Sequence, residues 1–556
     1  MSRRAALFPL ALLLAACASA TPAPTAPGPS SSGPSTEGAS PDGRSSSSAA
    51  AVAPAAVETP APLAAAPDAW QLLDLEGDGV PGVSAARAYD ELLAGRVPAR
   101  TVVVAVIDGG VDTAHVDLRE NLWRNPGETP GNGRDDDGNG FVDDVYGWNF
   151  IGGADGRNVG PETMEITRLY ARCRDGGAPP AGLTCDEITD AYQAEKGEVD
   201  QTLEVLDQID AAYAFALPLL RGAGAGDEPT VASVEALPAV RPDLAQAKQI
   251  FLQLAAAGIT PADIPEAREA YEGLRAYGFD PDFNPRTVVG DDPEDGSDAD
   301  YGNGDVMGPD ARHGTHVSGI IGAVRGNGIG LDGIASGVRI MTVRAVPDGD
   351  ERDKDVANAI RYAVDNGAHV INMSFGKSFS PQKELVDAAV RYADERGVLM
   401  IHAAGNDGED IDVEANFPSP FYADGGRAEL WIEVGAANWS EESLAAAFSN
   451  FGQASVDVFA PGVDILSTVP GGDVEREDGT SMASPVVTGV AALLLAYFPE
   501  LDAAEVRRIL LESAVDHGDQ TVPRPGVGDP VPFGTLSVTG AVINAYEAVR
   551  RALERM

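Results

Sequence analysis

The chain has 556 residues, 44% of them hydrophobic, which is enough apolar material for a sizeable core and for more than one domain. It carries 39 Lys and Arg against 86 Asp and Glu, a formal net charge of −47. That much negative charge repels phosphate backbones, so we expect no nucleic-acid partner.

The first 16 residues have the features of an export signal. Two arginines at positions 3–4 precede a short apolar run, 7–16, which is too short to span a bilayer as a mature helix. Small residues then lead directly into Cys17. This order resembles a bacterial lipoprotein signal, in which the cysteine is lipidated and becomes the new N-terminus. The alternative is an ordinary cleaved signal in which Cys17 is incidental. We expect an exported lipoprotein of the cell envelope, held at the outer membrane or cell surface by its lipid.

Residues 17–68 consist almost entirely of Ala, Pro, Ser, Thr and Gly. Such a segment cannot bury enough apolar surface to offset the entropy lost on ordering. It is therefore predicted to be a disordered tether between the lipid and the folded part, which we expect to begin near Trp70.

Short runs of β-branched and apolar residues alternate with helical patterns along most of the remaining chain. This alternation predicts an α/β fold with a parallel sheet covered by helices on both faces. The expected strands are 101–107, 338–343, 370–373, 398–403 and 432–435, and the expected helices are 355–366, 382–396 and 484–497. In such a sheet, functional residues gather at the carboxyl ends of the strands.

Residues 155–286 interrupt this rhythm and are predicted to form a mostly helical insertion. Val199, Leu203, Leu206, Ile209 and Tyr213 recur at intervals of three or four residues, as on one face of a helix.

Two further cysteines, Cys173 and Cys185, lie close together in this insertion. In an exported chain they can form a local disulfide, which we expect, although two free thiols are the alternative.

The segment 132–144 is an acidic loop with the spacing of a calcium site. Asp135, Asp137 and Asn139 stand at alternate positions before Gly140, as the oxygen ligands of an EF-hand loop do. The final Glu of that motif is absent, and Asp143 or Asp144 can replace it. We expect structural Ca²⁺ here, with a solvated acidic turn as the alternative. A second acidic run, 291–305, could hold another ion or be a solvated loop.

Four motifs occur in a fixed order, each of which could be unremarkable alone. They are Val-Ile-Asp-Gly-Gly at 106–110, His-Gly-Thr-His-Val-Ser-Gly at 313–319, Ala-Ala-Gly-Asn-Asp at 403–407 and Gly-Thr-Ser-Met-Ala-Ser-Pro at 479–485. Together they resemble the subtilisin-like serine protease family (subtilases), whose triad has the chain order Asp, His, Ser. The resemblance covers 69–154 and 287–556, which would be two parts of one peptidase domain on either side of the insertion.

The resemblance implies a serine endopeptidase that acts through an acyl-enzyme. Asp108, His313 and Ser481 would be its triad, and Asn406 would donate to the oxyanion. Protein or peptide substrates are expected, and the enzyme is expected to be a monomer. The rival hypothesis is a catalytically silent lipoprotein that binds peptides on the same fold.

Further residues match family positions. Ser374, Phe375 and Gly376 follow a strand and resemble the segment that lines the substrate cleft. Asp117 and Asn327 match ligands of the family's calcium site, although the loop after His313 is one residue longer here.

Overall fold

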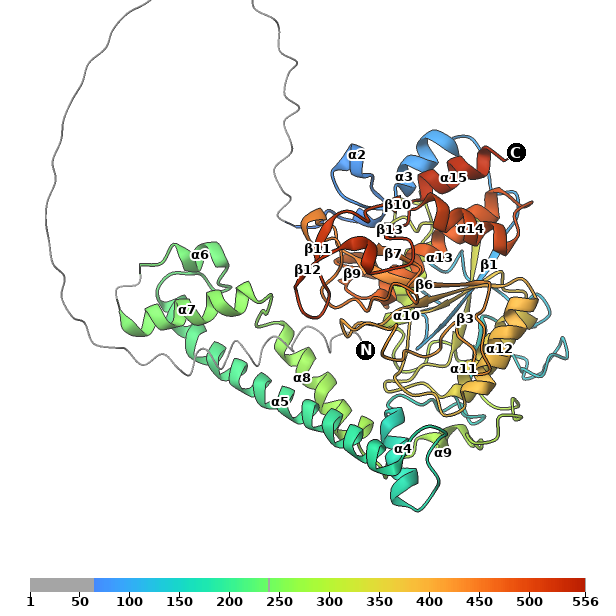
Figure 1. Ribbon diagram of the computed structural model, residues 1–556, viewed down its shortest axis with the longest axis horizontal. Helices are drawn as coiled ribbons and strands as arrows, with labels where there is room; N and C mark the ends of the chain where they lie inside the picture. The colour runs from blue at the N-terminus through green and yellow to red at the C-terminus, as the bar shows by residue number, and fades with distance from the viewer. Residues whose placement is uncertain (1–64, 239–240, 556) are drawn as a thin grey trace, which may run out of the picture.

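The computed structural model describes residues 65–238 and 241–555 (Figure 1). Cys17 and the part of the tether before residue 65 lie outside these ranges. Trp70 is fully buried, and its indole N–H donates to the carbonyl of Val463 (2.9 Å). The folded body therefore includes the residue at which folding was expected to begin.

The centre of the molecule is a nine-stranded, mostly parallel sheet with the order β10-β13-β7-β6-β5-β4-β1-β3-β2. Its strands are β1 (Val102–Asp108), β2 (Gly147–Asn149), β3 (Val338–Arg344), β4 (Val370–Met373), β5 (Leu399–Ala403), β6 (Trp431–Ala437), β7 (Val458–Pro461), β10 (Val515–Asp516) and β13 (Ala541–Val542). Two hairpins stand apart from it, β8 (Ile465–Val469) with β9 (Asp473–Glu477), and β11 (Thr521–Pro523) with β12 (Pro530–Pro532). The five predicted strands are confirmed, β4 with the predicted ends and the other four with ends shifted by one or two residues. Strands β2, β7, β10 and β13 and the two hairpins were not anticipated.

Helices cover both faces of the sheet, which explains why its central strands are continuous apolar runs. In β1, Val104 and Val106 pack in a core with α10 and α13, whereas Ala105 and Ile107 pack in a second core with α11 and α12. The body helices are α2 (Leu75–Asp78), α3 (Ala85–Arg87), α10 (Arg312–Gly322), α11 (Asp353–Asp365), α12 (Lys383–Glu395), α13 (Thr480–Tyr497), α14 (Ala503–Ser513) and α15 (Ala545–Leu553). Short single turns complete it: η1 (Trp70–Leu72), η2 (Ala88–Leu92), η4 (Glu441–Ser443) and η5 (Phe533–Thr535).

Helix α13 is long and apolar enough to cross a membrane by length and composition, but 94% of it is buried inside the protein. It packs against strands β4 to β7 and against α10, so it is the central helix of the core.

The predicted insertion is helical and has its own hydrophobic core, with buried residues from Met164 to Phe279. Its elements are α4 (Glu165–Arg174), α5 (Cys185–Gly222), α6 (Val231–Glu235), α7 (Pro242–Ala256), α8 (Asp263–Gly273) and η3 (Leu274–Gly278). The next helix, α9 (Arg286–Val289), contributes Val289 to the second core of the body. The 38 residues of α5 make it roughly 57 Å long, so the insertion extends well beyond the body, as the green ribbon in Figure 1 shows. The helical unit is narrower than 155–286, because residues 155–163 pair with the body: the N–H of Glu162 donates to the carbonyl of Asp348.

Cys173 and Cys185 form the predicted disulfide, with their Cα atoms 5.6 Å apart. The bond links the last turn of α4 to the first residue of α5 and so closes the loop between these two helices.

Candidate active site

Asp108 and His313 meet where the carboxyl end of β1 touches the start of α10. Nδ1 of His313 lies 2.9 and 3.0 Å from the two carboxylate oxygens of Asp108. The approach is close because Gly314 has no side chain: a Cβ there would stand 2.2 Å from the carbonyl oxygen of Gly110. The pair orients the imidazole with Nδ1–H toward the carboxylate, which leaves Nε2 free to accept a proton.

Opposing effects act on the imidazole of His313. Burial disfavours its charged form, but the charge and the hydrogen bond of Asp108 outweigh burial, so the pKa of His313 is raised above its ordinary value. Asp108 is 2% exposed, whereas the His313 side chain is 32% exposed and can reach a substrate.

Ser481 is the second residue of α13, at the end where helical N–H groups lack carbonyl partners. Its hydroxyl donates to the backbone carbonyl of Ser374 (3.2 Å), and among the described residues it makes no hydrogen bond with His313. His313 and Ser481 stand on helices α10 and α13, which pack against each other. Hydrogen bonds between a catalytic serine and histidine are often long or absent until substrate binds.

Asn406, just beyond β5, is held by the residue before Ser481. Its Oδ1 accepts from the N–H of Thr480 (2.8 Å) and from the hydroxyl of Thr480 (3.0 Å). Because a backbone N–H can only donate, the atom facing it must be the oxygen of the amide. The NH₂ group of Asn406 is therefore left to donate elsewhere, as an oxyanion ligand does.

The segment 374–376, predicted to line the substrate cleft, follows β4. The Ser374 hydroxyl is buried and turned toward α13, where it contacts the carbonyl of Ser481 (3.0 Å) and the hydroxyl of Ser484 (2.8 Å). Any substrate contact of Ser374 therefore falls to its backbone. Gly376 is exposed, and a Cβ there would stand 2.5 Å from Oδ1 of Asn416.

A buried His–Glu pair is hydrogen-bonded to the backbone of this segment. Nε2 of His402 donates to the carbonyl of Phe375 (2.8 Å), and Nδ1 lies 2.8 Å from Oε1 of Glu433. The other carboxylate oxygen of Glu433 accepts from the Trp431 indole (2.8 Å). The sequence offered no signal for this pair, because both residues lie inside apolar strands.

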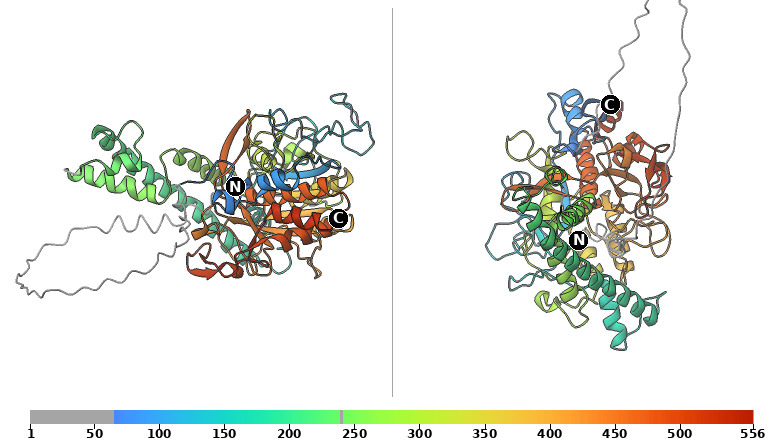
Figure 2. Two further views of the ribbon diagram at one scale, coloured as in Figure 1. Left: turned by 90° about the horizontal axis from the view of Figure 1, so that it is seen from above. Right: turned by 90° about the vertical axis from the view of Figure 1, so that its left-hand side faces the viewer.

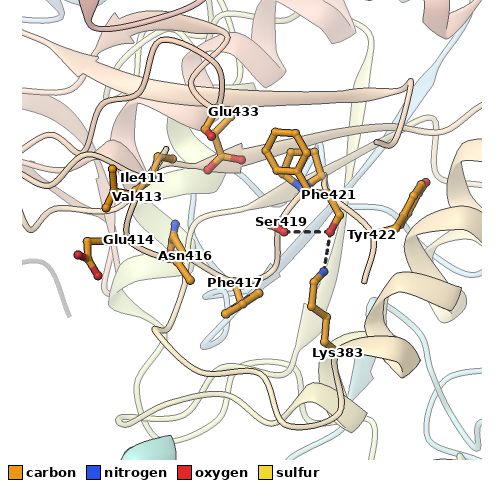
Figure 3. Close-up of a pocket in the computed structure, with 13 residues that line it drawn as sticks. Lys383, Ile411, Val413, Glu414, Asn416, Phe417, Ser419, Phe421, Tyr422 and Glu433 are labelled. Atoms are coloured by element: carbon orange, nitrogen blue, oxygen red, sulfur yellow. Dashed lines mark hydrogen bonds between the residues drawn. The ribbon is translucent and has the colours of Figure 1, made fainter. Parts of the chain in front are cut away.

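A pocket of about 310 Å³ lies beside this pair, lined mainly by residues 411–422 with Lys383, Glu433 and Ser455 (Figure 3). Its lining includes none of Asp108, His313 and Ser481. It shares Asn416 with the region of Gly376.

The acidic loop brings together a different ligand set from the predicted one. Carboxylate oxygens of Glu128, Asp137 and Asp144 lie within 4.8 Å of one another. Asp135 instead accepts from the N–H groups of residues 138–140, and Asp143 from those of residues 132–133. Asn139 borders the group, with its amide nitrogen 3.0 Å from Asp144. Of the predicted ligands, Asp137 and Asp144 belong to this group, whereas Asp135 and Asp143 accept from N–H groups of the loop itself.

The three carboxylates have the character of a cation site. Asp144 is fully buried, and burial raises the pKa of its carboxyl despite hydrogen bonds from Tyr362, Asn125 and Asn139. Oε2 of Glu128 is buried and has no hydrogen-bond partner. No Lys or Arg pairs with the group in the described part of the chain.

Asp117 and Asn327 are adjacent, as the resemblance implied. The amide nitrogen of Asn327 lies 2.6 Å from Oδ1 of the fully buried Asp117, and the N–H of Leu331 donates to Oδ2 (3.1 Å). Both carboxylate oxygens are thus hydrogen-bonded, so this place shows no unmet ligand of the kind that Glu128 shows.

Comparison with known proteins agrees with this geometry. The model of the subtilase family (Peptidase_S8) matches residues 99–528, which is more than half of the chain. The chain belongs to the subtilase family. The parallel sheet with helices on both faces is this subtilase's version of the fold, and the insertion lies between the family's first two motifs.

Individual relatives match smaller parts of this subtilase. The thermophilic serine proteinase of Bacillus sp. (strain AK1) is 40% identical over 215 residues, 38% of this chain and 48% of that protein. Subtilisin BL of Lederbergia lenta is 35% identical over 249 residues, 44% of this chain and 83% of that protein. A solved structure of proteases from Pseudoalteromonas arctica covers 86% of this chain and 96% of its own at 18% identity, with a TM-score of 0.45. The chain spans about half of the first relative's length.

The electrostatics of the His313–Asp108 pair predict the effect of Asp108→Asn. Removing the carboxylate removes what raises the pKa of His313, while burial, which lowers it, remains. We expect the pKa of His313 to fall below that of an ordinary histidine when it is measured by NMR titration of the imidazole. Asp112→Asn is the control, because that carboxylate accepts from the N–H groups of Ala114 and Gly471 instead. An unchanged His313 pKa in Asp108→Asn would contradict the assignment.

Proposed function

We propose that this subtilase is a serine endopeptidase that cleaves proteins or peptides. The observation that carries the proposal is the His313–Asp108 pair on α10, in a chain that belongs to the subtilase family. Helix α10 packs against α13, which carries Ser481 at its N-terminus. Relatives named as a serine proteinase and as subtilisins support the same reaction.

In the proposed reaction the Ser481 hydroxyl turns from the Ser374 carbonyl toward Nε2 of His313, which takes its proton. The serine oxygen then bonds to the scissile carbonyl carbon, and Asp108 stabilises the imidazolium. The amine leaves with the proton held by His313, and an acyl-enzyme remains. Water, deprotonated by the same imidazole, attacks the acyl carbon and releases Ser481.

The developing oxyanion would be stabilised by two donors. One is the N–H of Ser481, which points along the α13 dipole at its positive end. The other is the NH₂ of Asn406, whose orientation is fixed because Thr480 holds the amide oxygen. Donors that are oriented in advance stabilise the transition state without reorganising during the reaction.

We expect Ser481→Ala to abolish casein hydrolysis and labelling by a fluorophosphonate probe, because both need the activated hydroxyl. Asn406→Ala should keep labelling detectable but lower kcat about 10²- to 10³-fold, a magnitude that comes from subtilisin itself. Circular dichroism would show whether each variant is folded. Absence of labelling in the unaltered protein would favour the silent peptide-binding alternative instead.

We also propose that the acidic loop binds structural Ca²⁺ through Glu128, Asp137 and Asp144. The unpartnered Oε2 of Glu128 and the three adjacent carboxylates are the hard oxygen ligands that Ca²⁺ prefers. Bound Ca²⁺ would offset the mutual repulsion of these groups. Asp117 and Asn327 remain a second candidate, supported by their adjacency and by the resemblance.

Removing calcium with EGTA should therefore lower Tm, and Glu128→Gln should lower Tm in calcium and reduce the further loss on chelation. Glu294→Gln is a matched control, since Glu294 is exposed and lies outside the cluster. Equal Tm values with and without EGTA would contradict calcium binding. Equal chelation effects in Glu128→Gln and the unaltered protein would place the ion elsewhere.

We propose further that the chain is exported and anchored in the cell envelope through a lipidated Cys17, as a monomer. The support is the N-terminal pattern: a basic start, a short apolar run and small residues before the cysteine. A lipid on residue 17 followed by a polar tether would leave the peptidase free to reach substrates near the membrane.

Cys17→Ala should lose incorporated radiolabelled palmitate and move from the membrane fraction to the soluble fraction. Cys173→Ala, which removes a disulfide cysteine instead, should keep the label. Retention of palmitate by Cys17→Ala would show that the lipid, if any, is attached elsewhere.

A further inference from the structure

Lys377 lies one residue beyond the segment predicted to line the cleft, and its side chain is only 2% exposed. Its ammonium contacts the carboxylates of Glu165 (2.8 Å) and Asp353 (2.8 Å) and the carbonyl of Glu351 (2.8 Å). Glu165 is the first residue of α4 and therefore belongs to the insertion. A buried ammonium needs this many partners, because leaving it unpaired would be costly.

The insertion is bonded to the same place by other groups. Arg168, one turn further along α4, lies 2.5 Å from the same Glu165 carboxylate that Lys377 contacts. It also donates to the carbonyls of Asp350 (3.1 Å) and Glu351 (3.3 Å). The entry of the insertion is thus fixed to the loop after β3 by a buried network of both signs.

A second buried network lies where the chain leaves the insertion. Like the first, it includes residues of helix α11 in the body. Arg286 pairs with Asp355 (2.7 Å) and with Asp291, and Lys354 pairs with Asp291 (2.8 Å). Asp291 belongs to the acidic run that was considered for an ion, and the cations that it meets are the side chains of Arg286 and Lys354. Consecutive residues of the first turn of α11, 353–355, therefore hold the entry and the exit of the insertion.

Of these residues, Lys377 is the one whose backbone directly continues segment 374–376, the predicted wall of the substrate cleft. Its N–H donates to the carbonyl of Phe417 (3.0 Å), and the N–H of Phe417 donates back (2.9 Å). The preceding residue, Gly376, lies against Asn416. A shift of the Lys377 side chain would thus be passed directly to segment 374–376.

The charge of Glu266, in α8 of the insertion, acts on Arg312, the residue before His313. Burial lowers the pKa of Arg312, next to His313, but Glu477, Glu475 and Glu266 of α8 raise it above its ordinary value. In the right-hand view of Figure 2, the helices of the insertion lie in front of the α/β body.

We propose that Lys377 is a positioning residue that couples the helical insertion to the substrate-binding segment 374–376. Through Glu165, the insertion would hold this segment in the geometry that pairs with an extended peptide. The proposal rests on the proposed endopeptidase function. Under this proposal the insertion contributes to peptide binding and is not an independent module.

The test compares Lys377→Met with Lys354→Met in the otherwise unaltered protein. Both variants remove a buried ammonium beside the insertion, but Lys354 does not touch the cleft wall. Two substrates are used: a quenched-fluorescence peptide from a casein site that the unaltered enzyme cleaves, and p-nitrophenyl acetate, which occupies no extended subsites. Fluorophosphonate titration counts the active molecules in each preparation.

Lys377→Met should raise KM for the peptide about tenfold to a hundredfold, the scale on which small misplacements of a substrate act, with ester turnover nearly unchanged. Lys354→Met should lower Tm but leave the peptide KM within about twofold of the original, as for changes outside a binding site. Lys377→Arg, which keeps the charge, should raise the peptide KM less than Lys377→Met does. Equal KM changes in the two Met variants, or no change in Lys377→Met, would overturn the proposal.

Glu165→Gln is a milder variant that tests the same contact from the side of the insertion, alone or, where Lys377→Met folds, in combination with it. It should raise the peptide KM in the same direction, and adding it to Lys377→Met should change KM little, because both act through one contact. Additive effects would overturn the coupling. If the unaltered protein is not labelled by the fluorophosphonate, the endopeptidase function fails instead, and the two failures are thereby distinguished.

Discussion

Burial of a parallel sheet on both faces is the constraint on which the rest of this structure depends. Because the strands run in one direction, their carboxyl ends share an edge, and the side chains that follow them meet there. Asp108 ends β1, Ser374 follows β4 and Asn406 follows β5. Helix α13 then presents Ser481 to the same edge while its apolar length fills the core. The packing that stabilises the fold is therefore also what assembles the candidate catalytic residues.

The clustered carboxylates of this acidic protein have two kinds of surroundings. Around the insertion, buried carboxylates such as Glu165 and Asp355 are paired with Lys377 and Arg286 from distant parts of the chain. In the acidic loop, no basic side chain of the described residues pairs with Glu128, Asp137 and Asp144. Since like charges packed together raise the free energy of the folded state, this contrast favours an external cation at the loop and an internal one at the insertion.

The insertion has its own core and a local disulfide, yet its two ends are fixed by buried ion pairs rather than by a broad apolar interface of the two main cores. Such pairs depend strongly on geometry, because each partner left alone in the interior is penalised. They therefore define one orientation of the helices relative to the body. An insertion fixed in this way can hold segment 374–376 in one position, which a flexibly attached module could not do.

The sequence by itself determined the elements whose signal is local: the apolar strand runs, the helical periodicity of 155–286, the nearby cysteines and the ordered motifs around Asp108, His313 and Ser481. The motif alone, however, assigned Asp135 and Asp143 to a cation, whereas the folded loop uses them for its own N–H groups. Only the tertiary structure decided that Glu128 joins the carboxylate group, that Thr480 orients Asn406 and that Lys377 meets Glu165 across 212 positions. Those contacts join residues that share no motif or period, so their spacing in the sequence does not indicate them. They form because buried charges and amides are costly to leave without partners.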